Sequence, residues 1–155
     1  MINGVFDVSI EGIDEYEKMW AEDCKIDETN LVRESARIPL LHSKYYKLYH
    51  RSALKAIKLR YELKEMESIK NEYYSGTLDQ ETLKKYGWIP YGDKLIKSAV
   101  DRKVETDKDI AVLSLKIEYQ SSIAKFLEDV IKQINTRNFI IRNMVEMIKF
   151  QSGTN

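Results

Sequence analysis

Five basic side chains recur at helical spacing within one segment of the sequence: Lys44, Lys47, Arg51, Lys55 and Lys58. At roughly 100° per residue they fall within an arc of about 80° on one side of a helix. No acidic residue lies between Glu34 and Glu62, although opposite charges four residues apart would stabilise a helix. Repulsion along this basic stripe costs about 1–2 kcal/mol, on the usual scale for like-charge pairs. A polyanion bound to the stripe would relieve that cost.

Two kinds of partner fit the basic stripe. The first is single-stranded nucleic acid, because aromatic rings stack on unpaired bases and six tyrosines flank the stripe: Tyr45, Tyr46, Tyr49, Tyr61, Tyr73 and Tyr74. Tyr45 and Tyr49 share the apolar face of the helix, so we expect most of these rings in the core. The second is an acidic protein surface, since residues 1–30 hold nine acidic and two basic residues. We favour nucleic acid; the alternative is a helical scaffold or adaptor whose stripe binds acidic proteins.

The residue types that catalysis or metal binding would need are not arranged for it. The sequence has no GxxxxGK(S/T) phosphate-binding loop. His42 and His50 are eight residues apart, roughly 80° out of register on one helix, and no array of cysteines or carboxylates accompanies them. Cys24 has no base partner. We therefore predict no catalytic residues, no metal and no cofactor, in a protein that is not an enzyme.

Composition narrows the class of protein further. A single cysteine, Cys24, cannot form an internal disulfide, which favours a reducing compartment over a secreted, disulfide-bonded fold. No apolar run approaches the ~18 residues of a membrane span. The first residues also lack the basic stretch and apolar core of a secretory signal. We expect a soluble protein with no membrane association.

Long helices are the elements predicted to position the basic stripe. The chain has only 6 glycines and 2 prolines, and its many Lys, Glu, Ile and Leu residues are typical of an all-α fold. Residues 1–29 form an acidic N-terminal arm, with a strand-like or partner-binding stretch at residues 5–13 and a turn or two of helix at 15–22. We predict that residues 30–153 form a helical domain for DNA binding and oligomerisation. It contains a helix over about 40–75, a loop region over 77–106 and a C-terminal helix over about 107–150.

Local signals indicate where these helices begin and end. Pro39 marks a break or the first turn of the main helix, and Gly76 suits the left-handed residue that follows a helix. Asp107 or Thr106 should cap the last helix. In the loop region between them, we expect Trp88 to fix the loop against a helix rather than to bind a ligand.

The C-terminal helix carries two apolar seams, the first of which alternates steps of four and three residues, with Gln120, Ala124 and Asn138 at its less apolar positions. The first contains Leu113, Ile117, Leu127, Ile131, Ile134, Ile141, Val145 and Ile148. The second contains Val112, Leu115, Tyr119, Ile123, Phe126, Val130, Ile140, Met144 and Met147. Because a surface helix needs only one apolar stripe, we expect one seam inside the subunit and one on neighbouring subunits. We assign the first seam to oligomerisation; the alternative is a three-helix bundle with a large core.

Several short segments, in their order and spacing, carry a resemblance to one known family. They are residues 25–31 (KIDETNL), 72–76 (EYYSG), 106–109 (TDKD), 118–120 (EYQ) and 135–139 (NTRNF). The family is that of the UvsY recombination mediators of T4-like phages, which the chain resembles over roughly residues 22–153. The insertion that contains residues 87–90 (GWIP) resembles members from marine phages.

The resemblance implies a protein that binds single-stranded DNA without sequence preference and is not an enzyme. Family members form ring-like homo-oligomers through the C-terminal helix, so it implies a hexamer or heptamer. They help a RecA-like recombinase, UvsX, to replace the phage single-strand-binding protein during homologous recombination and repair. The implied location is the cytoplasm of the infected host cell.

One basic site departs from the family pattern. The best-known member has a basic pair in a Lys-Ala-Arg-Leu segment before its Tyr-Tyr-Ser-Gly, and this pair is assigned to DNA contact. Here the segment reads Ser68-Ile69-Lys70-Asn71, so only Lys70 keeps a basic charge. Either this DNA-binding site is weaker here, or its charge has moved along the helix to the basic stripe, joined by Arg60 and Lys64. We favour the second interpretation, with Lys70 at the end of the basic surface.

Overall fold

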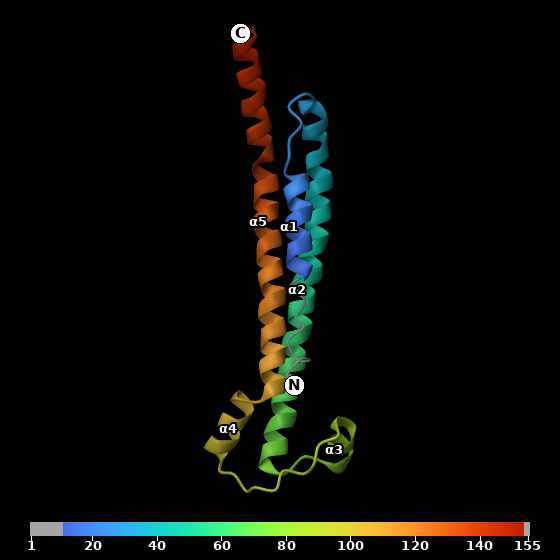
Figure 1. Cartoon of the computed structure of the whole chain (residues 1–155), viewed down its shortest axis with the longest axis vertical. Coiled ribbons are helices and arrows are strands. Elements are labelled where there is room, and N and C mark those ends of the chain that lie inside the picture. The colour runs from blue at the N-terminus through green and yellow to red at the C-terminus, as the bar shows by residue number, and fades with distance from the viewer. Residues whose placement is uncertain (1–10, 154–155) are drawn as a thin grey trace. The chain divides into compact units, whose positions relative to one another are not determined.

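The computed structural model describes residues 11–153, and all regular structure within that range is helical. The helices are α1 (Glu11–Asp23), α2 (Leu31–Ser75), α3 (Gln80–Tyr86), α4 (Lys97–Glu105) and α5 (Lys108–Gln151), drawn in Figure 1. The predicted all-α fold with long helices is confirmed. The chain divides into two compact units. Of the described residues, unit 1 contains 54–120 and unit 2 contains 11–53 and 121–153.

Helix α2 is longer than the sequence predicted, because it begins at Leu31 and contains Pro39. The side chain of Asn30 caps it by accepting a hydrogen bond from the Arg33 N–H at 3.1 Å. A proline inside a helix removes one backbone hydrogen bond, but buried residues on either side, Glu34 and Leu41, hold the helix in place. The expected break at Pro39 is therefore wrong.

The end of α2 is as predicted. Gly76 has a φ of 73°, the left-handed conformation that glycine adopts without steric cost. Its N–H bonds to the Tyr73 carbonyl at 3.1 Å, and the N–H of Thr77 bonds to the Glu72 carbonyl at 3.0 Å. These two bonds satisfy carbonyls that would otherwise lack partners at the helix end.

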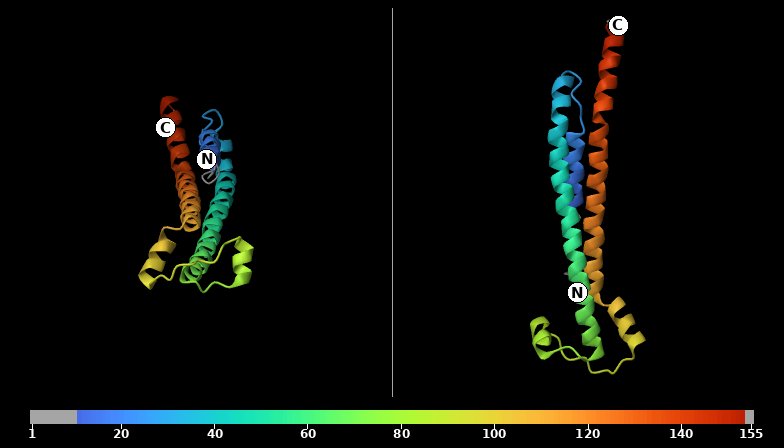
Figure 2. Two further views of the ribbon diagram at one scale, coloured as in Figure 1. Left: turned by 60° about the horizontal axis from the view of Figure 1, so that its bottom comes forward. Right: turned by 180° about the vertical axis from the view of Figure 1, so that it is seen from behind.

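Unit 2 is a bundle of α1, the first half of α2 and the last part of α5 (Figure 2). The segment expected to hold a turn or two of helix is the 13-residue helix α1. Trp20 of α1 packs edge-on against Tyr45 of α2, with ring centroids 5.3 Å apart. Tyr45 and, on α5, Leu127 and Ile134 are fully buried. Of the strand-like stretch predicted at 5–13, residues 5–10 lie outside the described residues.

Arg137 of α5 ties the α1–α2 connection into unit 2. Its guanidinium donates to the carbonyls of Cys24 at 3.0 Å and Lys25 at 2.7 Å, just beyond the end of α1. The same group pairs with the Glu34 carboxylate at 2.6 Å, where both side chains are less than a tenth exposed. Positive charge is favourable at the carbonyl end of a helix. Arg137 therefore fixes both the end of α1 and the start of α2.

Unit 1 contains the rest of α2, the short helices α3 and α4, and the start of α5. One buried cluster in it is formed by Val100, Val104 and Ile110, against which Leu63, Met66, Tyr74 and Leu95 pack. Helix α4 lies inside the region that the sequence indicated as loop, and it has only nine residues. The side chain of Asp107 caps α5 by accepting from the Asp109 N–H at 2.8 Å. This confirms one of the two predicted caps.

The buried line of α5 runs between the two predicted seams rather than along one of them. Ile117, Leu127, Ile134 and Ile141 come from the first seam, whereas Ile123 and Val130 come from the second. At 100° per residue the seams are only about 100° apart, so one neighbouring layer buries the adjoining edges of both. Four residues assigned to oligomerisation are thus buried within a single chain. Leu113, Ile131 and Val145 are half-buried, and Ile148 is 48% exposed.

Candidate nucleic-acid interface

The basic stripe lies on α2, which is helical throughout residues 31–75, so the spacing read from the sequence holds. Lys44, Lys47 and Arg51 are exposed on unit 2, and Lys55, Lys58, Arg60 and Lys64 are exposed on unit 1. Within the described part of the chain, Lys47, Arg51 and Lys55 have no carboxylate within ion-pair distance. The Lys58 ammonium lies 3.9 Å from the Glu62 carboxylate on the same helix, and both side chains are largely in solvent. Such an exposed pair contributes little and leaves Lys58 able to meet a phosphate.

Lys44 differs, because its ammonium meets the carboxylate of Asp23 at the end of α1 at 2.5 Å. Arg37 pairs with the other oxygen of Asp23 at 2.8 Å, and the Tyr45 hydroxyl donates to the carboxylate at 3.0 Å. Burial disfavours the charged carboxylate, but hydrogen bonds from Lys44 and Tyr45 and the nearby positive charges outweigh it, so the pKa of Asp23 lies below its usual value. One member of the stripe thus already pairs with the acidic arm, as the alternative partner would require.

Lys70 does not fit the predicted DNA-binding role. It is 5% exposed, and its ammonium lies 3.0 Å from Asp107 and 2.6 Å from Asp109. The same ammonium sits 4.0 Å from the centre of the Trp88 ring. A side chain held in this way is not available to a phosphate, and the basic surface ends before it. The sequence could not reveal this, because the partners of Lys70 come from distant parts of the chain.

Asp107 is the centre of this buried network in unit 1. Besides capping α5 and pairing with Lys70, it accepts a hydrogen bond from the Tyr74 hydroxyl at 2.7 Å. Burial works against its charge, but the hydrogen bonds from Tyr74 and Lys70 hold the pKa of Asp107 below its usual value. Burial and the same hydrogen bond raise the pKa of Tyr74. The network is a structural joint between α2 and α5 rather than a site for chemistry.

The tyrosines divide into core and surface rings. Tyr45 is fully buried, whereas Tyr46 is 46% and Tyr61 is 70% exposed. Tyr73 belongs to an aromatic cluster in unit 1, where its ring centre lies 5.1 Å from that of Trp88 and its hydroxyl donates to the Ile89 carbonyl at 3.0 Å. The ring of Trp88 therefore fixes the loop, as predicted. Only Tyr46 and Tyr61 remain as strongly exposed rings beside the stripe.

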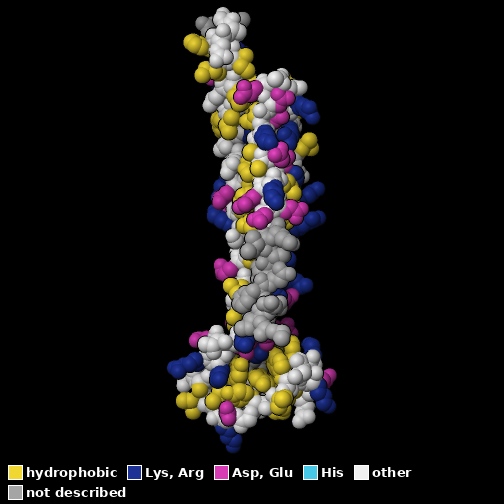
Figure 3. All heavy atoms as spheres, viewed as in Figure 1, with side chains coloured by type: hydrophobic (Ala, Val, Ile, Leu, Met, Phe, Trp, Pro, Cys, Tyr) yellow, Lys and Arg dark blue, Asp and Glu magenta, His cyan; other side chains and the backbone are white. Residues whose placement is uncertain are grey.

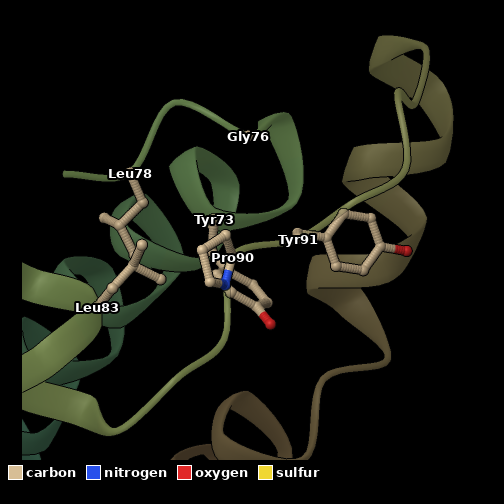
Figure 4. A pocket seen from close by; sticks show the side chains of 6 residues that line it. All are labelled: Tyr73, Gly76, Leu78, Leu83, Pro90 and Tyr91. Atoms are coloured by element: carbon tan, nitrogen blue, oxygen red, sulfur yellow. The ribbon is translucent and has the colours of Figure 1, made fainter. Parts of the chain in front are cut away.

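A small pocket lies next to the aromatic cluster of unit 1. Its volume is about 40 Å³, and it is lined by Tyr73, Gly76, Leu78, Leu83, Pro90 and Tyr91 (Figure 4). Ligand pockets usually measure about 300–1,000 Å³, so this pocket is too small to hold a nucleotide. Within residues 11–153, no group of three or more His, Cys, Asp or Glu side chains is placed to hold a metal ion. None of the helices there is long and apolar enough to cross a membrane.

Exposed apolar side chains gather toward the C-terminal end of α5, where Figure 3 shows hydrophobic surface. Phe139 is 67%, Met147 is 60% and Phe150 is 77% exposed, and Ile140 and Ile148 are almost half exposed. We call these five residues the α5 end patch. It surrounds the last buried position of the helix, Ile141, and extends past it toward the C-terminal end. A second surface therefore exists on α5, at its end rather than along a full-length seam.

Comparison with known proteins identifies the family. The sequence model described as "Recombination, repair and ssDNA binding protein UvsY" matches residues 19–154. The recombination protein uvsY of Enterobacteria phage T4 is 28% identical over 134 residues, which cover 85% of this chain and 91% of that protein.

Solved structures agree in fold. One crystal structure of the bacteriophage T4 recombination mediator protein UvsY superposes with a TM-score of 0.76 at 20% identity, over 89% of this chain and 98% of that one. A second crystal form gives a TM-score of 0.75 at 22% identity, over 88% and 98%. Since the family match spans nearly the whole described range, the chain belongs to the UvsY family of recombination, repair and ssDNA binding proteins.

Proposed function

We propose that this protein is a recombination mediator that binds single-stranded DNA through the exposed basic residues of α2. The observation that carries the proposal is the row Lys47, Arg51, Lys55 and Lys58, which faces solvent on one helix. Phosphate contacts supply affinity without sequence information, so binding is non-specific. Arg60 and Lys64 extend the charge farther along α2 within unit 1. Lys44 also contacts the strand once its ion pair with Asp23 is broken.

The mediator step follows from holding the strand. A strand held on α2 is no longer available to the phage single-strand-binding protein. Because the strand is already ordered, the incoming RecA-like recombinase, UvsX, loses less entropy when it binds. The chain itself supplies position and charge, and no bond is made or broken. The action takes place in the cytoplasm of the infected host cell, where the phage DNA recombines.

Assembly of several subunits would strengthen DNA binding, because the basic row of one subunit alone binds weakly. We place the contact between subunits at the α5 end patch, because apolar surface that the chain itself does not cover marks interaction sites. In a ring of six or seven subunits, each basic row would engage the same strand at high effective concentration. The buried residues Ile117, Leu127, Ile134 and Ile141 serve the core of the subunit instead.

The test is fluorescence anisotropy of a labelled oligo-dT, beside duplex DNA, across a series of salt concentrations. If each protomer neutralises about four phosphates, the logarithm of the binding constant falls with the logarithm of salt at a slope of about −2.8. The double variant Lys47→Gln/Arg51→Gln should weaken binding and flatten the slope. The matched control is Lys125→Gln/Lys132→Gln, which removes two exposed positive charges from α5 and should leave binding intact.

A second candidate function rests on the Lys44–Asp23 ion pair. It shows that the stripe can accept a carboxylate, as an adaptor for acidic proteins would. The same salt series separates the two candidates. An adaptor would ignore oligo-dT at low salt while the oligomer stays intact, and this result would reject the DNA-binding proposal.

A further inference from the structure

Four rings, two of them exposed and two half-buried, form a row of ring contacts along α2 in unit 2. His42 stacks on Tyr46, with ring centroids 5.6 Å apart and planes 18° apart. Tyr46 meets His50 edge-on at 4.5 Å, and Tyr49 lies 5.6 Å from His50. Because His42, Tyr46 and His50 are four residues apart, they occupy successive turns of one helix face. We call His42, Tyr46, Tyr49 and His50 the ring ladder.

The ring ladder is a surface feature rather than part of the core. Tyr46 is 46% exposed, whereas the adjacent Tyr45 is fully buried. His50 is exposed, and His42 and Tyr49 are half-buried. Among the described residues, the two imidazoles and the Tyr46 hydroxyl make no hydrogen bond or ion pair. The rings therefore support one another without being needed to satisfy a buried polar group.

The position of the ladder beside the basic stripe indicates what it binds. Lys47 and Arg51 directly follow Tyr46 and His50 in the sequence, so each exposed ring has a cation about 100° around the helix. Phosphates and bases of one strand lie on opposite sides of its sugars, and this pairing of ring and cation offers a surface to each. Contact between the rings already restricts their rotation, which lowers the entropy lost on binding.

The spacing of the ladder selects the form of the strand. Successive rungs are four residues apart, and their ring centres lie 5.6 Å (His42 to Tyr46) and 4.5 Å (Tyr46 to His50) from one another. Nucleotides in a duplex strand rise by only about 3.4 Å. Bases on successive rungs are therefore separated from one another, as in an extended single strand, and duplex bases, which are paired and stacked, are not available.

We propose that the ring ladder stacks the bases of an extended single strand while Lys47 and Arg51 hold its phosphates. This inference rests on the proposed function and adds base stacking to it. Stacking is tolerant of sequence because every base has a flat face. Binding thus remains non-specific, yet it distinguishes single strands from duplex DNA.

The experiment compares oligo-dT with an oligonucleotide of the same length that has abasic sites throughout, both labelled and both at one salt concentration. The two carry the same phosphates, and only oligo-dT has bases. The protein should bind oligo-dT about tenfold more tightly, within the usual range for one aromatic contact. Tyr46→Leu should reduce this preference, because it removes the central ring of the ladder, and it should leave the phosphate contacts to the abasic strand in place. Tyr46→Phe keeps the ring and should retain the preference.

Each outcome bears on one claim. Equal binding of oligo-dT and the abasic strand by the unmodified protein overturns the ring ladder but leaves the phosphate contacts standing. Absence of binding to either strand overturns the proposed function itself. If Tyr46→Leu binds oligo-dT as tightly as Tyr46→Phe does, the stacking role is likewise rejected. The comparison of strands with the unmodified protein decides the question even if a variant fails to fold.

Discussion

At the scale of single residues, Arg137 and Glu34 form a charge pair that is almost fully removed from solvent. The guanidinium also serves the carbonyls at the end of α1, while its Nε atom has no partner in the described part of the chain. A buried pair of this kind adds little net stability over apolar residues of the same shape, but loss of one partner leaves an uncompensated charge.

Arg137→Met should therefore destabilise unit 2 strongly, by about 3–5 kcal/mol in the free energy of unfolding. The measurement is urea unfolding followed by circular dichroism. Arg142→Met is the matched control, because Arg142 pairs with Glu146 in solvent and such pairs contribute at most about 1 kcal/mol. Equal stability of the two variants would mean that Arg137 does not anchor the α1–α2 connection.

Asp23 should give stability a dependence on pH. Its pKa is lower in the folded chain than its ordinary value of 3.8, so the folded state holds the proton less tightly than the unfolded state. The stabilisation is complete above the unfolded value and is lost as the pH falls through the folded value. Asp23→Asn should reduce stability at pH 7 and match the unmodified protein at the acid end of a pH series of urea titrations. A constant difference at all pH values would contradict this.

At the scale of elements, one helix changes the role of its basic residues along its length. On α2, Lys55 is exposed, whereas Lys70 is buried between Asp107 and Asp109. The two residues are four turns apart and carry the same charge. Their surroundings, not their chemical type, decide which of them can bind DNA.

Lys55→Gln and Lys70→Gln should consequently have opposite effects. Lys55→Gln should weaken oligo-dT binding with no change in thermal stability. Lys70→Gln should lower the melting temperature, because it leaves two carboxylates without their cation, and should leave the salt slope of DNA binding unchanged. Fluorescence anisotropy measures the DNA affinity of the two variants, and thermal unfolding followed by circular dichroism measures their stability. A loss of DNA affinity in stable, folded Lys70→Gln would restore Lys70 to the interface.

Local sequence signals predicted the helix ends correctly where no distant part of the chain affects the backbone. Gly76 ends α2 and Asp107 caps α5, because glycine and aspartate act through their own backbone neighbourhood. The start of α2 was missed because packing on both sides of Pro39 overrides its local effect. Helix α4 was missed because nine residues with two buried valines carry too little periodicity.

The candidate site was predictable only in part. The spacing of the basic stripe gave its helix face correctly, since α2 is continuous. The burial of Lys70 depends on Trp88 and Asp109, which lie far along the chain. Helical periodicity predicts only contacts between residues close in sequence, so it could not predict these. The ring ladder could have been found from the four-residue steps between His42, Tyr46 and His50, had the histidines been considered as rings rather than as metal ligands.

At the scale of the whole molecule, apolar surface remains exposed near the C-terminal end of α5, where no other described segment covers it. The α5 end patch begins beside Ile141, the last buried residue of α5, and continues to Phe150. A continuous apolar end on a long helix is suited to contact with copies of itself, because identical subunits repeat one surface around a symmetry axis.

Ile148→Asp should reduce the mass of the particle, measured by multi-angle light scattering, while helicity is preserved. Leu115→Asp is the control, since Leu115 is similarly exposed on α5 but lies in unit 1, and its mass should not change. Leu127→Asp should instead unfold the chain, because it places a charge in a fully buried position. Unchanged mass for Ile148→Asp would place the subunit contact elsewhere.

The placement of the two tryptophans makes the chain suitable for optical work. Trp20 lies against Tyr45 in unit 2, and Trp88 lies against Tyr73 and Tyr86 in unit 1. The sequence contains just these 2 tryptophans, so each unit has its own emission. With Trp88→Phe the fluorescence of the protein reports on unit 2, and with Trp20→Phe it reports on unit 1. Melting, strand binding and assembly can thus be assigned to one unit or the other without an attached dye.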